Sequence, residues 1–464
     1  MNPKRAFDRC EVFWHVPGSG AGTDRIRIGD LARDRENHLY FAYEKEWLPR
    51  GIEISPSFLP LELGTTPTSI TDPKSSAYEQ NPGLRNEFRG LPGPFYDSLP
   101  DKWGMTLLAN HTGKDPDSID VLEILCHRGL RCMGAFSYEP ADSHNATAEA
   151  LSCETLDLYC QKAAQLAAGI EPDTLGKTIL DALEDSGGSA GGMRPKMLLA
   201  IRKEDLFGGD PVAASALRKL AGYDHHDMAS DFQPWLLKFD TEPDKCRGLI
   251  ENACANMARA AGVTMPETTL IRTKSPDGVQ HAHFATLRFD RQLVGDQWHR
   301  VHMHTAAGIL RRDYNELDLD YTDLLELTKI LTGDPSQVRQ VYLRAVFNVL
   351  AGNSDDHAKN HAFLLDSTAK WRVSPAYDLT PSSLRLQPGI RSTSVLGNKN
   401  EKIPLSTLKE LAQEHGINDP MPIIQQVSEA IKKWGDFAKA AGIPNHIVGR
   451  YGNRMTAIHP QELI

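Results

Sequence analysis

The stretch LAGNSDDHAKNHAFLLD, residues 350–366, places side chains that could do chemistry between two apolar segments. The run before it has the spacing of a buried helix, and the run after it has the composition of a strand. Asp355 and Asn360 lie five residues apart within it. An aspartate can accept the proton of an attacking hydroxyl, while an asparagine and a second carboxylate can hold the cations of a nucleotide. The spacing therefore indicates phosphoryl transfer.

A predicted hairpin supplies the second carboxylate. HAFLL (361–365) and WRVSP (371–375) have strand composition and are joined by the short turn DSTAK. Because an antiparallel hairpin returns the chain to where it began, position 378 should end near position 360. We therefore expect Asp378 beside Asn360, and oxygen ligands of this kind suit Mg²⁺.

Two other interpretations of this stretch stay open. A loop rich in Asn, Ser and Asp can simply be solvated and inert, since these are the usual loop residues. His357 and His361 could instead ligate zinc, because the spacing H-x-x-x-H puts both on one face of a helix. No glutamate follows the first histidine, and the segment looks like a loop entering a strand, so zinc is the less favoured interpretation.

A glycine-rich loop could contact the phosphates of a nucleotide. SGGSAGGMRPK (186–196) combines four glycines with an arginine and a lysine before an apolar strand. Glycines let backbone N–H groups approach phosphate closely. The loop matches neither the P-loop nor the dinucleotide fingerprint, and a flexible linker is the simpler alternative.

A lysine within a predicted buried strand is more informative. Lys238 lies in WLLKFD (235–240), where it either contacts phosphates from a buried strand or lies exposed on an edge strand. Glu251, thirteen residues later, could pair with it. It lies off the centre of the apolar face of the helix predicted at 249–262, which favours a solvated glutamate.

Composition limits the classes of protein to consider. The 464 residues are 40% apolar and 24% charged, which is typical of a soluble globular protein with two or three domains. The net charge of −10 gives no basic field for nucleic acid. We find neither a signal-peptide pattern nor a membrane-length apolar run, so we expect a cytoplasmic protein without membrane contact. Seven scattered cysteines without a C-x-x-C pair indicate reduced thiols.

The order of segments predicts an α+β architecture. Residues 1–138 are rich in Pro and Gly and suggest a β-rich module. A helix is expected at 151–168, strands at 235–240 and 283–290, and mainly helices beyond residue 300. A β-rich N-terminal half and a helical C-terminal half would leave a cleft between them.

Taken together, these segments resemble the HipA family, the serine/threonine-protein kinase toxins of HipA–HipB toxin–antitoxin systems. The match runs over nearly the whole chain in the same order. The N-terminal part contributes LPLELG, FRGLPGPFYDSLPDKWG and LCHRGLRCMGAFSYEP. The later part contributes GGSAGGMRPK, WLLKFD, ENACANMARAAGV, RFDR, NVLAGNSDDHAKN and SPAYDLTPS. The combination is specific, although no single motif would be.

The resemblance implies a bilobal protein-kinase-like fold related to the lipid kinases. Its β-rich N-terminal lobe would carry an extra N-terminal subdomain, and its C-terminal lobe would be mainly helical. The expected divisions are 1–138 for the HipA-type N-terminal subdomain, 139–290 for the nucleotide-binding part with the glycine-rich loop and hinge, and 291–464 for the helical catalytic lobe.

The resemblance also implies roles for individual residues. Asp355 becomes the catalytic aspartate, Asn360 and Asp378 become the Mg²⁺ ligands, and Lys238 contacts the phosphates of ATP. The other implied nucleotide contacts are Gly191, Gly192, Met193, Arg194, Pro195 and Lys196 in the phosphate loop, Leu287, Arg288 and Phe289 in the hinge, and His357, Ala358, Lys359 and Tyr377.

Three residues near these motifs have competing interpretations. Ser189 matches the autophosphorylated serine of the family, where phosphate would add up to two negative charges at the site for the ATP phosphates. Without the resemblance, Ser189 is a small linker residue. For Arg288 and Asp290, an ion pair that supports the hinge is as good an interpretation as a catalytic part.

The implied function is an ATP- and Mg²⁺-dependent serine/threonine kinase that arrests growth by phosphorylating a protein such as an aminoacyl-tRNA synthetase. The implied partner is a HipB-like helix-turn-helix antitoxin, through which DNA would be contacted. The alternatives are a kinase-fold corepressor that binds ATP without transfer, and a small-molecule or lipid kinase. VHMHTAAG (301–308) replaces a common acidic pair, and the polar segment 204–232 is long, so partner and substrate contacts could differ.

Overall fold

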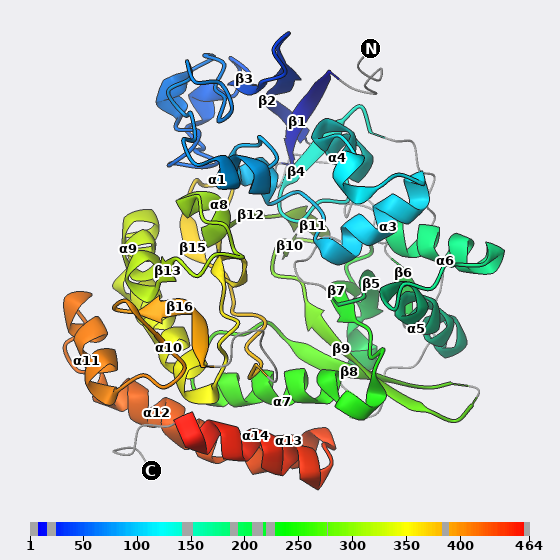
Figure 1. The fold of residues 1–464 in the computed structure, drawn as a ribbon, viewed down its shortest axis with the longest axis vertical. Helices are drawn as coiled ribbons and strands as arrows, with labels where there is room; N and C mark the ends of the chain where they lie inside the picture. Colours follow the sequence, from blue (N-terminus) through cyan, green and yellow to red (C-terminus); the bar gives the residue numbers. More distant parts are fainter. Residues whose placement is uncertain are drawn as a thin grey trace.

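The computed structural model shows two sheet-containing parts above and beside a helical C-terminal part (Figure 1). No helix in the described ranges combines the length and apolar character of a membrane span. The residues that the structure describes are 8–15, 25–141, 152–185, 194–206, 217–219, 228–275, 277–382 and 389–458.

Residues 8–141, called the N-terminal subdomain below, contain a four-stranded antiparallel sheet in the order β3-β2-β1-β4. In β1, alternate residues Cys10, Val12 and Trp14 are buried, as expected for a strand with one face on a core. The strands are β1 (Arg9–His15), β2 (Arg25–Arg33), β3 (Leu39–Tyr43) and β4 (Phe136–Glu139).

Four short helices between β3 and β4 make this subdomain less β-rich than expected. They range from 4 to 11 residues. Such helices show little periodicity, and prolines near the starts of two of them resemble loop signals in the sequence. The helices are α1 (Pro82–Glu87), α2 (Gly93–Tyr96), α3 (Lys102–Thr112) and α4 (Val121–Arg128).

A five-stranded antiparallel sheet in the order β6-β5-β7-β9-β8 has β7 at its centre. One face packs on α3, α5 and α6 through alternate residues such as Met197 and Leu199 of β5 and Trp235 and Leu237 of β7. The predicted buried strand and helix are confirmed. The new elements are α5 (Cys153–Ala167), α6 (Thr174–Asp185), β5 (Lys196–Arg202), β6 (Leu217–Lys219), β7 (Phe232–Lys238), β8 (Thr268–Lys274) and β9 (Gln280–Leu287).

Helix α7 (Arg247–Ala260) lies close against β9. A Cβ at Gly248 would lie 2.0 Å from the carbonyl oxygen of Ala282, so this approach requires glycine. The helix ends just before Gly262, whose φ of 87° suits the left-handed region. The helix predicted at 249–262 is therefore confirmed.

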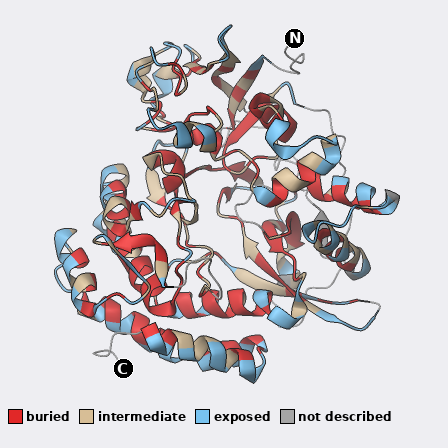
Figure 2. Cartoon of the chain, in the orientation of Figure 1, coloured by how far each residue is buried: buried red, intermediate tan, exposed pale blue. Residues whose placement is uncertain are grey.

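The C-terminal lobe, residues 291–458, is mainly helical, as predicted. Helix α10 is buried from Val341 to its last residue, Ala351 (Figure 2). The predicted hairpin is present as β14 and β15, and β12 joins it in the order β12-β14-β15. The elements are β10 (Arg291–Val294), β11 (Gln297–Arg300), β12 (His302–Thr305), α8 (Ala306–Leu310), β13 (Leu319–Asp320), α9 (Tyr321–Thr332), α10 (Pro335–Ala351), β14 (Ala362–Leu365), β15 (Trp371–Val373), β16 (Ile390–Val395), β17 (Asn398–Asn400), α11 (Leu405–Glu414), α12 (Met421–Lys432), α13 (Trp434–Ala441) and α14 (Asn445–Ile458).

The N-terminal subdomain docks on β12 through a buried polar contact. Asp97 accepts hydrogen bonds from the backbone N–H and the hydroxyl of Thr305 at 2.7 and 2.6 Å, and its carboxylate lies 2.5 Å from His304 Nδ1. Ser55 Oγ lies 3.0 Å from His304 Nε2. These three side chains have the order of a Ser-His-Asp triad, but Ser55 and His304 are fully buried, so substrate has no access. The contact is structural, and it uses residues of the segment 301–308.

Glu184 of α6 is a buried carboxylate that joins this helix to α4. Its oxygens lie 2.9 Å from His127 Nε2 and 2.7 Å from Arg131 Nη1, and only 3% of its side chain is exposed. Burial alone would raise the pKa of Glu184, but the hydrogen bond with His127 and the charge of Arg131 lower it to about 2. Glu184 therefore stabilises the fold only while it is ionised.

We predict that Glu184→Gln lowers the free energy of unfolding at pH 6 by about 3 kcal/mol. The pKa of Glu184 is lower in the folded protein than the unfolded value of about 4.3. Its contribution to the free energy of unfolding is therefore complete above about pH 4.3 and is lost as the pH falls toward the folded pKa. The difference between the two proteins should shrink to about half by pH 3. Urea unfolding from pH 6 to pH 3 measures this, with Glu171→Gln, an exposed site, as the control. A difference that stays constant with pH would contradict it.

Candidate active site

The stretch that indicated phosphoryl transfer forms the loop between α10 and β14. Helix α10 ends at Gly352, whose φ is 75°, and a short 3-10 turn spans Ala358–Asn360. The two adjacent carboxylates of this loop differ in environment, because Asp355 is exposed whereas Asp356 is buried. Asp355 is therefore the carboxylate that solvent or substrate can reach.

Asp356 anchors the loop to the C-terminal lobe. Its carboxylate accepts hydrogen bonds from Arg391 Nη2 at 2.6 Å and from the Tyr321 hydroxyl at 2.7 Å. Arg391 is itself fully buried. Removing one partner of such a pair leaves an uncompensated charge in the core, so the pair fixes the position of the loop. The sequence did not single out Arg391.

Asn353 links the backbones of Asp355 and Asp378, and Asn360 joins them through Asp355. It donates from Nδ2 to the Asp378 carbonyl oxygen at 3.1 Å, and its Oδ1 accepts the backbone N–H of Asp355 at 3.1 Å. Asn360 Nδ2 in turn donates to the Asp355 carbonyl oxygen at 2.8 Å. Asp355, Asn360 and Asp378 thus lie together in one network, while sequence reasoning missed Asn353.

Asp378 follows the hairpin and contacts the lysine of β7. Its φ is 54°, a left-handed conformation that non-glycine residues seldom adopt outside functional sites and turns. Its carboxylate, 32% exposed, forms an ion pair with Lys238. Burial alone would raise the pKa of Asp378, but the charge and hydrogen bond of Lys238 hold that pKa well below its usual range.

Lys238 is buried between two carboxylates, and one of them corrects a prediction. Glu251 of α7, expected to be solvated, is only 5% exposed and pairs with Lys238 and, at 2.8 Å, with Arg194. Glu251 lies beside the apolar face of α7, and this side of the helix faces Lys238 and Arg194 instead of water. Burial alone would lower the pKa of Lys238, but Asp378 and Glu251 raise it above its usual value.

Lys196 lies directly opposite Lys238 in the β5–β7 register, so both side chains leave the same face of the sheet. Lys196 is buried and forms an ion pair with Asp101, which precedes α3. Burial lowers the pKa of Lys196, and Asp101 opposes that effect. The sequence did not indicate Asp101 as a partner, because it lies 95 residues earlier in the chain.

Arg288 and Asp290, beside the predicted hinge, form a buried ion pair, which was one of the two interpretations considered for them. Arg288 donates from Nε and Nη2 to Asp290 at 3.0 and 2.9 Å, and both residues are buried. The backbone N–H groups of Leu287 and Arg288 donate to the carbonyl oxygens of Glu267 and Pro234, each at 2.9 Å. The amides at 287 and 288 therefore already have partners.

Aromatic contacts join the hinge to the segment around Asp378. The rings of Phe289 and Tyr377 stack with centroids 5.6 Å apart. The Tyr377 hydroxyl donates to the Lys359 carbonyl oxygen at 2.6 Å, and Ala358 beside it is buried. The hinge, the segment after β15 and the loop after α10 are thus in contact.

Lys359 is directed toward aromatic rings. Its ammonium lies 4.2 Å from the ring centroid of Tyr96 in the N-terminal subdomain and 4.3 Å from that of Tyr314. Burial lowers the pKa of Lys359, and acidic neighbours including Glu87 oppose that effect. The predicted nucleotide contact from Lys359 stays a prediction.

The two histidines of the loop do not form a zinc site among the described residues. Neither His357 nor His361 belongs there to a close group of three His, Cys, Asp or Glu ligands. His361 Nε2 lies 3.2 Å from the Asp356 carbonyl oxygen, and burial lowers its pKa to about 4. Burial also lowers the pKa of His357. These side chains serve the packing of the loop.

Much of the glycine-rich loop lies outside the described residues, including the predicted residues Ser189, Gly191, Gly192 and Met193. Of its last residues, Arg194 pairs with Glu251, and the Pro195 carbonyl oxygen accepts the backbone N–H of Phe239 at 2.9 Å. The end of the loop is therefore fixed to β7 and α7.

Comparison with known proteins agrees with this arrangement. A Haemophilus influenzae protein named "Putative kinase" is 24% identical over 242 residues, which cover 50% of this chain and 60% of that protein. "Putative kinase Y4mE" of Sinorhizobium fredii is 25% identical over 367 residues, 76% of this chain and 74% of that protein. The chain thus spans less than two thirds of the Haemophilus protein.

A solved structure establishes the fold. HipA in the complex of HipA, HipB and operator DNA from Shewanella oneidensis superimposes with a TM-score of 0.61 at 15% identity, over 93% of this chain and 94% of that one. The predicted α+β, bilobal kinase-like fold is confirmed.

Two family models match the sequence itself. The HipA N-terminal domain matches residues 22–139, and the HipA-like C-terminal domain matches residues 188–434, more than half of the chain. The chain belongs to the HipA family.

Proposed function

We propose that this protein is an ATP- and Mg²⁺-dependent serine/threonine-protein kinase that acts as the toxin of a toxin–antitoxin pair. The observation that carries the proposal is the single network of Asp355, Asn360 and Asp378 beside the buried lysine of β7. The names of the curated relatives support a kinase. The divisions at 1–138, 139–290 and 291–464 stay part of the proposal.

Asp355 would orient the hydroxyl group that attacks the γ-phosphate and accept its proton. It is exposed, as a residue that meets a protein substrate must be. Its backbone N–H is held by Asn353, and its neighbour Asp356 is anchored in the core. These contacts would hold the backbone that carries the Asp355 carboxylate.

Asn360 and Asp378 would hold Mg²⁺. The Asn360 amide nitrogen donates to the Asp355 carbonyl oxygen, which leaves Oδ1 as the possible ligand atom. Asp378 is partly exposed and its lowered pKa keeps it ionised. An amide and a carboxylate oxygen are the donor set that Mg²⁺ accepts while keeping several waters. When bound, the ion would neutralise charge on the phosphates.

Lys238 would contact the phosphates of ATP. Glu251 fixes its ammonium from α7, in the manner of the lysine–glutamate pair of protein kinases. Arg194, in the last part of the proposed phosphate loop, pairs with the same glutamate. If adenine is read at the hinge, the contacts would come from Phe289 or from carbonyl oxygens, since two hinge amides are occupied.

The proposed partner is a HipB-like helix-turn-helix antitoxin. The structural neighbour from Shewanella is a HipA bound with HipB and operator DNA. Because this chain carries a net charge of −10, we propose that it reaches DNA through the antitoxin. The proposed substrate is a cytoplasmic protein such as an aminoacyl-tRNA synthetase, and the proposed inactivating autophosphorylation site is Ser189.

We predict that Asp355→Asn and Asp378→Asn each lower phosphate transfer from radiolabelled ATP at least about 100-fold and remove growth inhibition. Glu316→Gln, an exposed carboxylate of the same lobe, is the control and should keep both. Label on Ser189 or another protein hydroxyl supports the proposal. ATP binding without transfer would indicate a corepressor, and label only on added metabolites or lipids would indicate a small-molecule kinase. Full toxicity of either aspartate variant would refute the assignment.

We predict opposite outcomes for the two adjacent aspartates. Asp356→Ala should lower the free energy of unfolding by roughly 3 to 5 kcal/mol, because it leaves the Arg391 charge buried and unpaired. Asp355→Ala should change it by no more than about 0.5 kcal/mol while abolishing transfer. Urea unfolding followed by circular dichroism measures both. Equal destabilisation by the two substitutions would contradict the roles given to them.

We predict that Glu251→Gln weakens catalysis without abolishing it. A neutral amide keeps a hydrogen bond with Lys238 but loses the charge that fixes it, so kcat should fall about 10- to 100-fold. Lys238→Met should be inactive. Steady-state kinetics over a range of ATP concentrations measures kcat and KM separately. A Glu251→Gln enzyme with wild-type kcat and KM would show that this pair does not position the lysine.

A further inference from the structure

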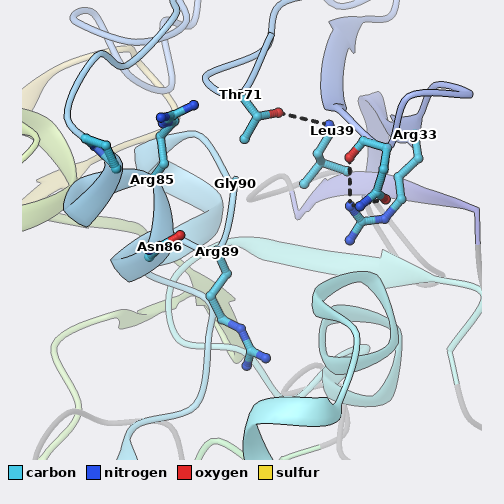
Figure 3. A pocket seen from close by; sticks show the side chains of 9 residues that line it. Arg33, Leu39, Thr71, Arg85, Asn86, Arg89 and Gly90 are labelled. Atoms are coloured by element: carbon cyan, nitrogen blue, oxygen red, sulfur yellow. Dashed lines mark hydrogen bonds between the residues drawn. The ribbon is translucent and has the colours of Figure 1, made fainter.

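The N-terminal subdomain contains a cavity of about 500 Å³ that the kinase proposal does not use. Figure 3 shows Arg85 and Arg33 on opposite sides of it, with Thr71 and Leu39 between them. Its lining includes three arginines and two asparagines but no carboxylate. The lining residues are Arg33, Asn37, Leu39, Thr71, Pro82, Arg85, Asn86, Arg89 and Gly90.

Within the described residues, two of the three guanidinium groups form no salt bridge, although the charges of Asp117 and Asp120 act on Arg89. Arg33 is paired with Asp120 at 2.8 Å. Arg85 lies 5.1 Å from the ring centroid of Tyr78, and its Nε is buried without a hydrogen-bond partner. Arg89 donates from Nη2 to the Ile119 carbonyl oxygen at 2.9 Å. Within the described ranges, neither Arg85 nor Arg89 forms an ion pair, although the chain has ten more acidic than basic residues.

The backbone beside the cavity holds an unusual conformation. Arg89 has a φ of 50°, in the left-handed region that a long side chain seldom adopts, and the next residue, Gly90, has a φ of 80°. This conformation ends helix α1, where the backbone N–H of Gly90 donates to the Arg85 carbonyl oxygen at 3.0 Å. It places an arginine at the wall of the cavity.

We propose that this cavity binds a small phosphate-bearing molecule. Guanidinium groups match the oxygens of phosphate with two parallel hydrogen bonds, and the amides of Asn37 and Asn86 add neutral donors. Leu39 and Pro82 supply an apolar wall for the rest of the ligand. The volume falls within the range of small-molecule sites, about 300 to 1,000 Å³. The site is separate from the proposed ATP site and goes beyond the proposed function.

The cavity shares helix α1 with a contact to the catalytic loop. Arg85 and Asn86 line the cavity, and the next residue, Glu87, accepts a hydrogen bond from the Tyr96 hydroxyl. The ring of Tyr96 lies against the ammonium of Lys359. A ligand in the cavity would therefore contact residues next to Glu87, the partner of the tyrosine that contacts the loop carrying Asp355.

The test is isothermal titration of the full chain with inorganic pyrophosphate in the absence of Mg²⁺. Arg85→Gln removes a phosphate donor, and Asn86→Asp places a negative charge at an exposed lining position that should not disturb folding. Each should weaken binding at least about tenfold. Arg50→Gln removes one exposed positive charge of the same subdomain outside the cavity and should bind as wild type.

Two further titrations distinguish binding in this cavity from binding at the proposed ATP site and from non-specific binding of anions. Lys238→Met disables the proposed ATP site and should leave cavity binding unchanged, so failure of the kinase proposal would not affect this result. Citrate tests whether any polyanion binds equally well. The proposal is overturned if the wild-type protein shows no saturable binding of pyrophosphate, or if Arg85→Gln and Asn86→Asp bind it as tightly as Arg50→Gln. It is also overturned if only Lys238→Met loses binding, or if citrate binds as tightly as pyrophosphate.

Discussion

The ammonium of Lys238, buried between the carboxylates of Glu251 and Asp378, is the interaction on which the site depends. A buried ammonium is costly unless it is paired, and here its two partners come from different parts of the molecule. Glu251 belongs to α7, while Asp378 follows the β14–β15 hairpin of the C-terminal lobe. Lys238 thus joins β7, the central strand of the five-stranded sheet, to α7 and to the segment after the β14–β15 hairpin. Because these ion pairs span the elements, the geometry of the site depends on how the two lobes pack.

The loop after α10 is held from two sides. From inside the C-terminal lobe, Arg391 holds Asp356. From the N-terminal subdomain, Tyr96 contacts Lys359, and the neighbouring Asp97 holds β12, the strand that pairs with β14. The subdomain is therefore part of what positions the loop. The segment 301–308 serves this docking contact.

The sequence predicted those parts of the site that depend on local patterns. The hairpin that returns Asp378 follows from two short strands around a turn, and the helix at 249–262 follows from its periodicity. Partners far apart in the chain could not be predicted, because periodicity says which residues share a face but not what that face meets. Glu251 illustrates this limit, since the same pattern fits a glutamate facing water and one facing a lysine. The contacts of Asp101, Asn353 and Arg391 were missed for the same reason. The short helices between β3 and β4 were missed for another reason, because they show little periodicity and prolines near two of their starts resemble loop signals.

The central claim is that Asp355, Asn360 and Asp378 act on one nucleotide-bound magnesium ion. A crystal structure with Mg²⁺ and a non-hydrolysable ATP analogue tests this most directly. We expect a cation about 2.1 Å from Asn360 Oδ1 and from an Asp378 carboxylate oxygen, with the γ-phosphate facing Asp355. A nucleotide bound elsewhere, or a cation coordinated without Asn360 and Asp378, would contradict the account.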